Sequence, residues 1–134
     1  MKKNNKVKVA VYGTLMLGEA NEHWREGIPT IAEATVEGRL YDTGYGYPAI
    51  VPEEGAGLVA VEILETDSAG VAHMDILEGY PRLYRRDEVA YRTADGRTGK
   101  ALVYRMNTLP RGATVIEPND GTADWRAYRR KCVI

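Results

Sequence analysis

One carboxylate in the middle of the chain is placed where acid–base chemistry is possible. Glu78 follows the segment DSAGVAHMDIL, in which Val71, Met74 and Leu77 recur at helical spacing and form one apolar stripe. At about 100° per residue, Glu78 projects onto the same inward side of a helix. A carboxylate on a core-facing stripe is unfavourable unless it is paired or serves a purpose. Glu78 is therefore the first candidate functional residue.

The position of Glu78 within its helix predicts a raised pKa. Its place in the last turn exposes it to the negative end of the helix dipole, and desolvation acts in the same direction. Both effects move the pKa of the carboxyl toward neutrality, which suits a general acid/base. The residues alone leave two other outcomes open. In the first, the Glu78 side chain bends outward to solvent as the helix ends. In the second, Glu78 forms an ion pair with an arginine such as Arg85 or Arg86.

A second candidate lies in AVYGTLMLG, residues 10–18, where a strand of alternating valines arrives at Tyr12 and is followed by Gly13 and Thr14. A turn after a strand can direct successive backbone N–H groups into a concavity that holds an anion or a polarised carbonyl. Gly13 would let a ligand approach the backbone, although a tight turn alone also explains a glycine. A phosphate loop is excluded because glutamate and alanine follow Gly18, where that motif needs lysine and a hydroxyl residue.

Tyrosines are abundant, with nine in the chain and no phenylalanine. A cavity lined by tyrosine would suit a small polar ligand, because the hydroxyl groups can form hydrogen bonds. Tyr84 begins a predicted strand shortly after Glu78, and Tyr104 lies on another. The two histidines, His23 and His73, have no carboxylate or cysteine pattern around them, so we expect no metal site.

Composition limits the class of protein. The 134 residues carry a net charge of −1, with 44% hydrophobic and 28% charged residues, which predicts a single domain over 1–134 with 1–6 as a flexible tail. The charge gives no reason to expect nucleic acid or an anionic membrane as a partner. We expect a cytoplasmic protein, since no apolar run or signal peptide is present and Cys132 is a lone cysteine. The basic cluster of Arg126, Arg129, Arg130 and Lys131 predicts a solvated helix face or tail.

Hydrophobic patterning predicts mostly strands and few helices. One helix follows Asp67 or Ser68 and ends at Glu78, because Gly79 is a stop signal. A shorter helix is expected in WRAYRRK, and residues 19–26 add a turn or two. In GLVAVEIL, alternation places Val59, Val61 and Ile63 on one face and Glu62 on the other. The predicted strands are 7–12, 33–42, 47–52, 57–64, 84–93 and 99–106. This pattern indicates a small mixed barrel or curled sheet.

Four segments together resemble the γ-glutamylcyclotransferase family, particularly its γ-glutamylamine cyclotransferase-like branch. They are VYGTLMLGEANEHW, GRLYDTGYGYPAIV, LEGYPRLYRR and DWRAYRR, and the resemblance spans residues 7–130. It implies an α+β fold: a small mixed β-barrel of about five to six strands with one main helix, short flanking helices and a ligand cavity. It also implies that no cofactor is used. The sequence departs from that branch at Met16 and Leu17, where members often carry lysine or arginine.

The resemblance also implies a reaction. The α-amine of a γ-glutamyl amine or γ-glutamyl amino acid attacks the γ-carbonyl of the same molecule, giving 5-oxoproline and a free amine. Glu78 would be the catalytic acid/base. The implied substrate-binding residues are Tyr12, Gly13, Thr14, Leu15, Tyr84 and Tyr104. Two alternatives stay open: a non-catalytic domain that binds a small carboxylate in the same cavity, and a related amide reaction in which Glu78 activates water.

Overall fold

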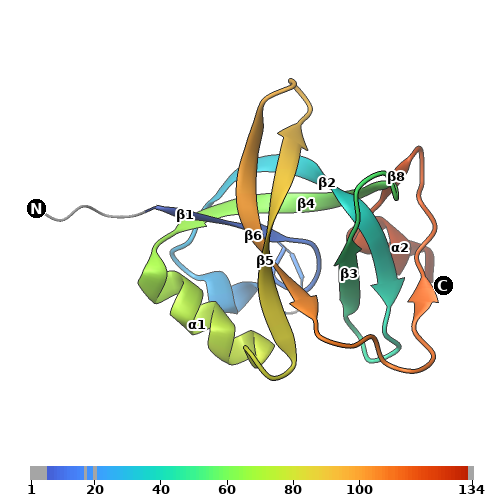
Figure 1. Cartoon of the computed structure of the whole chain (residues 1–134), viewed down its shortest axis with the longest axis horizontal. Coiled ribbons are helices and arrows are strands. Elements are labelled where there is room, and N and C mark those ends of the chain that lie inside the picture. The colour runs from blue at the N-terminus through green and yellow to red at the C-terminus, as the bar shows by residue number, and fades with distance from the viewer. Residues whose placement is uncertain (1–5, 17, 20, 133–134) are drawn as a thin grey trace, which may run out of the picture.

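Five strands close into a barrel. The computed structural model describes residues 6–16, 18–19 and 21–132. The barrel strands are β1 (Val7–Val11), β2 (Thr30–Asp42), β4 (Leu58–Thr66), β5 (Tyr84–Thr93) and β6 (Thr98–Met106). Their order is β2–β5–β6–β1–β4, and a further pairing of β2 with β4 closes the ring (Figure 1). All neighbours are antiparallel except β1 and β6, which makes the barrel mixed.

Strand β2 continues from the barrel into a smaller sheet. Its first half pairs with β4 and β5, and its second half pairs with β3 (Pro48–Pro52) and β7 (Thr114–Val115). The change of partner occurs at Gly38, where a Cβ atom would lie 2.6 Å from the backbone oxygen of Val51. Only glycine permits this approach of two backbones. The short β8 (Thr122–Ala123) extends the barrel sheet by pairing with β4.

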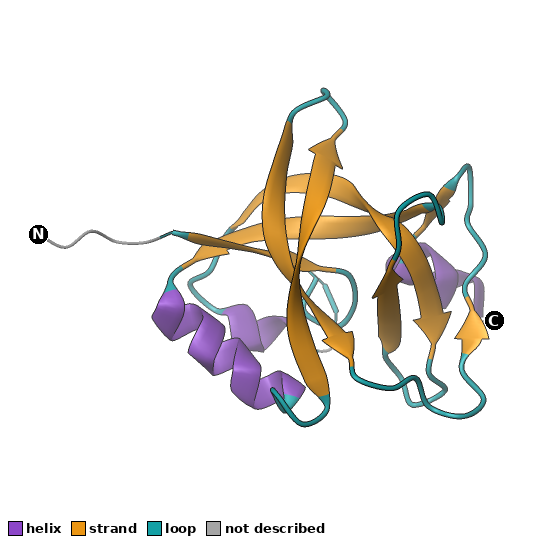
Figure 2. Ribbon diagram, viewed as in Figure 1, coloured by secondary structure: helices purple, strands orange, loops and turns teal. Residues whose placement is uncertain are grey.

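Three helical segments flank the strands, as Figure 2 shows in purple. They are the 3-10 helix η1 (Glu22–Arg25), α1 (Ser68–Glu78) and α2 (Trp125–Cys132). Helix α1 begins where the Asp67 carboxylate accepts a hydrogen bond from the Gly70 N–H. It ends at Gly79, whose φ of 67° is left-handed. None of the helices in the described part of the chain is long and apolar enough to cross a membrane.

Two groups of buried apolar side chains hold these elements together. The first fills the barrel and includes Val36, Val61 and Val103. The second lies between the barrel wall and α1, and it contains Met16, Met74 and residues that flank the cavity described below. Because α1 packs through this second group, the inner face of the helix and the end of β1 share one apolar environment.

The predicted fold class is confirmed, and the strand and helix predictions match within a few residues. The structure adds three features to these predictions. Strand β2 starts at Thr30, three residues before the predicted position 33, and the two-residue strands β7 and β8 were not predicted. Glu62 lies on the face of β4 opposite Val61 and is 1% exposed, so both faces of β4 are buried at that point. The expected tail, residues 1–6, falls outside the described residues except for the last of them.

Candidate active site

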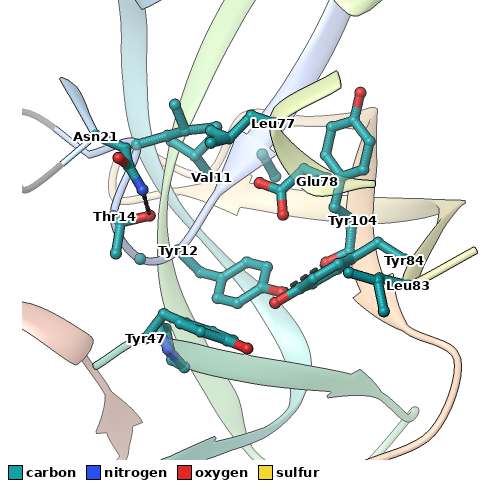
Figure 3. A pocket seen from close by; sticks show the side chains of 14 residues that line it. Val11, Tyr12, Thr14, Asn21, Tyr47, Leu77, Glu78, Leu83, Tyr84 and Tyr104 are labelled. Atoms are coloured by element: carbon teal, nitrogen blue, oxygen red, sulfur yellow. Dashed lines mark hydrogen bonds between the residues drawn. The ribbon is translucent and has the colours of Figure 1, made fainter. Parts of the chain in front are cut away.

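A cavity of about 220 Å³ lies between the end of β1 and the end of α1 (Figure 3). All seven sequence-predicted site residues line it, although they come from strands, loops and a helix far apart in the chain. The lining residues are Ala10, Val11, Tyr12, Gly13, Thr14, Leu15, Asn21, Tyr47, Pro48, Leu77, Glu78, Leu83, Tyr84 and Tyr104. The fold therefore brings the predicted residues to one place, while their individual roles stay predictions.

The end of helix α1 aims Glu78 into this cavity. After Glu78 the backbone reverses through Gly79, whose N–H donates to the Ile76 carbonyl, while the Tyr80 N–H donates to the Asp75 carbonyl at 3.0 Å. Figure 3 shows the carboxylate of Glu78 pointing toward Tyr12 and Val11. Burial raises the pKa of Glu78 from 4.5 to about 7. A carboxyl with this pKa can both accept and donate a proton near neutral pH.

Neither alternative placement of Glu78 is found. Its side chain is partly buried and lines the cavity, so it does not bend out to solvent. The two candidate arginines have other partners: Arg85 lies 3.5 Å from Asp87, and Arg86 lies 3.7 Å from Asp75. Among the described residues no hydrogen bond or ion pair holds the Glu78 carboxyl. Its raised pKa follows from this burial without a counter-ion.

The loop after β1 forms a tight turn on the opposite wall. The Met16 N–H donates to the Gly13 carbonyl at 3.0 Å, and Asn21 donates to Thr14 through its backbone at 2.8 Å and its side chain at 2.9 Å. In the described chain, the N–H groups of Thr14 and Leu15 have no hydrogen-bond partner. Since peptide N–H and C=O groups point in opposite directions, engaging the carbonyls leaves these N–H groups available to a ligand.

Packing against Pro48 explains why residue 13 is a glycine, and the sequence alone did not reveal this contact. A Cβ atom there would lie 2.6 Å from the Pro48 ring, so the side-chain-free backbone is required by packing between the turn and β3. The sequence departs from the resembling branch at Met16 and Leu17. The Met16 side chain is fully buried beneath the turn. Leu17 lies outside the described residues.

The cavity tyrosines differ in how their hydroxyls are used. Tyr12 donates to the Tyr104 backbone carbonyl at 2.6 Å, and the Tyr104 hydroxyl donates to the Asp75 carboxylate at 2.6 Å. The Tyr104 ring therefore lines the cavity while its hydroxyl points to α1. Tyr84 is 8% exposed, and within the described chain its hydroxyl has no partner. Desolvation raises the pKa of Tyr84 above its ordinary value, so the hydroxyl stays protonated and can donate.

Sequence reasoning missed Tyr47, Asn21 and Leu83 as cavity residues. In the sequence, nothing distinguished Tyr47 from the other tyrosines. In the structure it lines the cavity, and its ring centroid lies 6.4 Å from that of Tyr45. Asn21 follows the turn by several residues and gave no periodic signal. Leu83 is 62% exposed, and only its place at the cavity mouth makes it notable.

A buried ion cluster behind the loop was also missed. Arg25 and Arg126 pair with the two oxygens of Glu62 at 2.9 and 3.0 Å. Arg126 therefore does not belong to a purely solvated helix face as predicted. The positions of these residues, far apart in the chain, gave no indication that they would meet.

Within the described chain, the cavity brings together one unpaired carboxyl of near-neutral pKa and backbone N–H groups without a partner, an arrangement that is chemically able to transfer protons to and from a small polar molecule. The sequence comparison identifies the family: residues 9–127 match the model of the family described as "Gamma-glutamyl cyclotransferase, AIG2-like". The chain belongs to this family.

A curated relative agrees with that assignment, and solved structures share the fold. The γ-glutamylcyclotransferase family protein ytfP of Citrobacter rodentium is 30% identical over 83% of this chain and 91% of its own length. The structure of protein PH0828 from Pyrococcus horikoshii is similar with a TM-score of 0.71 and 28% identity, covering 94% of this chain and 95% of that one. YkqA from Bacillus subtilis gives a TM-score of 0.76 with 25% identity. The match covers 96% of this chain but only 42% of YkqA.

Proposed function

We propose that this protein is a γ-glutamylcyclotransferase that converts a γ-glutamyl amine or γ-glutamyl amino acid into 5-oxoproline and a free amine. The observation that carries the proposal is the Glu78 carboxyl, whose pKa of about 7 and lack of a counter-ion in the described chain suit a proton shuttle. The family membership supports the same reaction class. The branch we favour is the one that acts on γ-glutamyl amines.

The reaction needs little more than positioning and proton transfer. Glu78 takes a proton from the α-ammonium group, and the freed amine attacks the γ-carbonyl carbon of the same molecule. Because nucleophile and electrophile are in one substrate, holding a folded conformer supplies much of the acceleration. Glu78 then gives its proton to the leaving nitrogen as the carbon–nitrogen bond breaks. The ring nitrogen loses its second proton to solvent, and the lactam is complete.

The opposite wall of the cavity supplies donors for the charge that develops. Attack on the γ-carbonyl creates an oxyanion, which the N–H groups of Thr14 and Leu15, unpartnered within the described residues, can stabilise. The Tyr84 hydroxyl is a further donor on the other side of Glu78. We propose Tyr12 and Gly13 as residues that shape the glutamyl end of the site, and the Tyr104 ring as a wall rather than a hydrogen-bond donor.

The test is release of 5-oxoproline from a panel of γ-glutamyl amines, γ-glutamyl amino acids and glutathione. We expect turnover by the parent protein and a loss of at least 100-fold in Glu78→Gln, while the exposed control Glu88→Gln keeps the parent rate. Binding of 5-oxoproline by calorimetry checks that Glu78→Gln retains its cavity. Binding without turnover by the parent protein would favour the non-catalytic alternative, a domain that holds small carboxylates.

A further inference from the structure

The buried cluster around Glu62 contains more than a charge pair. Glu62 is 1% exposed and Arg25 is 4% exposed, so both charges are removed from water. A buried ion pair is weak evidence of stabilisation, because desolvation offsets the attraction and apolar residues of similar volume serve as well or better. The contacts of Arg25 beyond Glu62 suggest what the pair is for.

The Arg25 guanidinium connects three segments of the chain. One nitrogen, Nη1, donates to Glu62 and also to the Leu15 carbonyl at 3.2 Å. The other, Nη2, donates to the Ile28 carbonyl at 3.3 Å and to the Thr30 hydroxyl. A planar guanidinium fixes the directions of its donors, so these contacts set the position of Leu15 relative to β4 and the start of β2.

The Leu15 carbonyl is the last of three that define the turn against the cavity. The Gly13 carbonyl accepts from Met16, the Thr14 carbonyl accepts from Asn21, and only the Leu15 carbonyl takes its donor from a charged side chain. The Leu15 carbonyl shares its peptide plane with the Met16 N–H, which donates to the Gly13 carbonyl, so Arg25 holds the plane that closes the turn. The two planes before it carry the N–H groups of Thr14 and Leu15, which have no partner in the described chain.

We propose that Arg25, anchored by Glu62, is a positioning residue that orients the 13–16 turn so that its free N–H groups face the substrate. This inference rests on the proposed function for its consequence in catalysis. Arg25 lines no part of the cavity and acts through the Leu15 carbonyl. Losing it would let the turn rotate, and the donors that stabilise the oxyanion would lose their alignment.

Arg126 provides a matched control. It pairs with Glu62 at 3.0 Å, as Arg25 does, but it comes from α2, its side chain is 22% exposed, and its other ion-pair partner is Asp124 at 3.7 Å. Arg126→Ala therefore disturbs the charge balance of Glu62 without removing a contact to the turn. A double variant, Arg25→Met with Glu62→Met, removes the two buried charges together. The remaining charge of the cluster is that of Arg126, which is partly exposed and keeps Asp124 as a partner.

The experiment compares Arg25→Lys, the Arg25→Met/Glu62→Met pair and Arg126→Ala with the parent. With γ-glutamyl-n-propylamide as substrate, we expect kcat to fall at least tenfold in the first two and to change less than twofold in Arg126→Ala, because a misaligned donor acts on the transition state. In the folded variants, amide hydrogen exchange of Met16, whose N–H donates to the Gly13 carbonyl and closes the turn, should rise at least tenfold while exchange in β4 stays the same. A merely structural role would lower stability without this local change.

Two results would overturn the inference. One is a folded double variant with parental kcat and parental exchange in the turn. The other is an equal loss in Arg126→Ala, which would make the charge of Glu62 the cause. If the parent turns over no γ-glutamyl compound, the proposed function fails, and the exchange measurement, which needs no substrate, decides the positioning role by itself.

Discussion

Replacing Glu78 with glutamine should make the protein more stable at alkaline pH. The pKa of Glu78 is about 7 in the folded state against an ordinary value of 4.5, so the folded protein holds a proton that the unfolded chain releases between those values. The stability of the parent is therefore unaffected by this group below pH 4.5, falls as pH rises through the interval, and stays lower above pH 7. A glutamine side chain at this position would resemble the neutral acid and avoid the loss.

The magnitude follows from the size of that interval. A gap of roughly 2.5 pH units corresponds to roughly 3 kcal/mol at about 1.4 kcal/mol per unit. Solvent in the cavity screens part of this, which leaves about 2–3 kcal/mol. For a chain of this length, such a gain raises the thermal midpoint by roughly 10 °C.

The assay is urea unfolding of the parent, Glu78→Gln and the exposed control Glu88→Gln at about pH 4.5 and pH 8. We expect Glu78→Gln to gain about 2–3 kcal/mol over the parent at the higher pH and almost nothing at the lower, and the control to match the parent at both. A Glu78→Gln variant that is less stable at pH 8, or whose gain is independent of pH, would refute the argument from burial.

Further predictions concern the cavity. Tyr104→Phe should lose about 1–2 kcal/mol in urea unfolding, since a hydrogen bond to a carboxylate disappears, with kcat unchanged because that hydroxyl faces α1. Tyr84→Phe should show the reverse, a tenfold or greater fall in kcat/KM measured by initial rates, without loss of stability. Equal behaviour of the two variants would contradict the different roles proposed for the two hydroxyl groups. Gly13→Ala should lose about 1–3 kcal/mol and raise KM, because its Cβ would collide with the Pro48 ring at 2.6 Å, and parental values would show that the ring can move aside. The kcat/KM of the parent should rise with pH through about 7 as Glu78 ionises, and a profile flat across that range would exclude Glu78 as the base.

The part of this site that could be predicted from sequence is the part set by local rules. The apolar spacing in α1 and the cap at Gly79 located Glu78 on an inward face at a helix end, and both follow from helix geometry. The turn after β1 was equally visible, because a valine alternation stops at Tyr12. These signals lie within a few residues of the groups they position.

The rest depends on contacts between distant segments. The alternation of β4 placed Glu62 on the face opposite Val61 but did not show that this face is buried. The ion pairs of Glu62 are with Arg25 and Arg126, which no pattern in the sequence connects to it. Gly13 is fixed by Pro48 on another strand. A two-residue strand such as β7 is too short to show a hydrophobic period in the sequence. It is recognised only in the structure, where it pairs with β2.

Strand β6 closes the barrel by joining β5 on one side and β1 on the other, and it follows a hairpin turn whose Asp95 and Gly96 are exposed. In Figure 1 this hairpin extends away from α1. A cut at that turn would divide the protein into a first fragment carrying Glu78 and a second carrying the closing strand with Tyr104. Neither piece alone would contain a complete barrel, so recovered activity on mixing would report their reassociation. The hairpin thus makes this protein suited to use as a split reporter, in which the enzymatic activity recovered on mixing measures how much of the two fragments has reassociated.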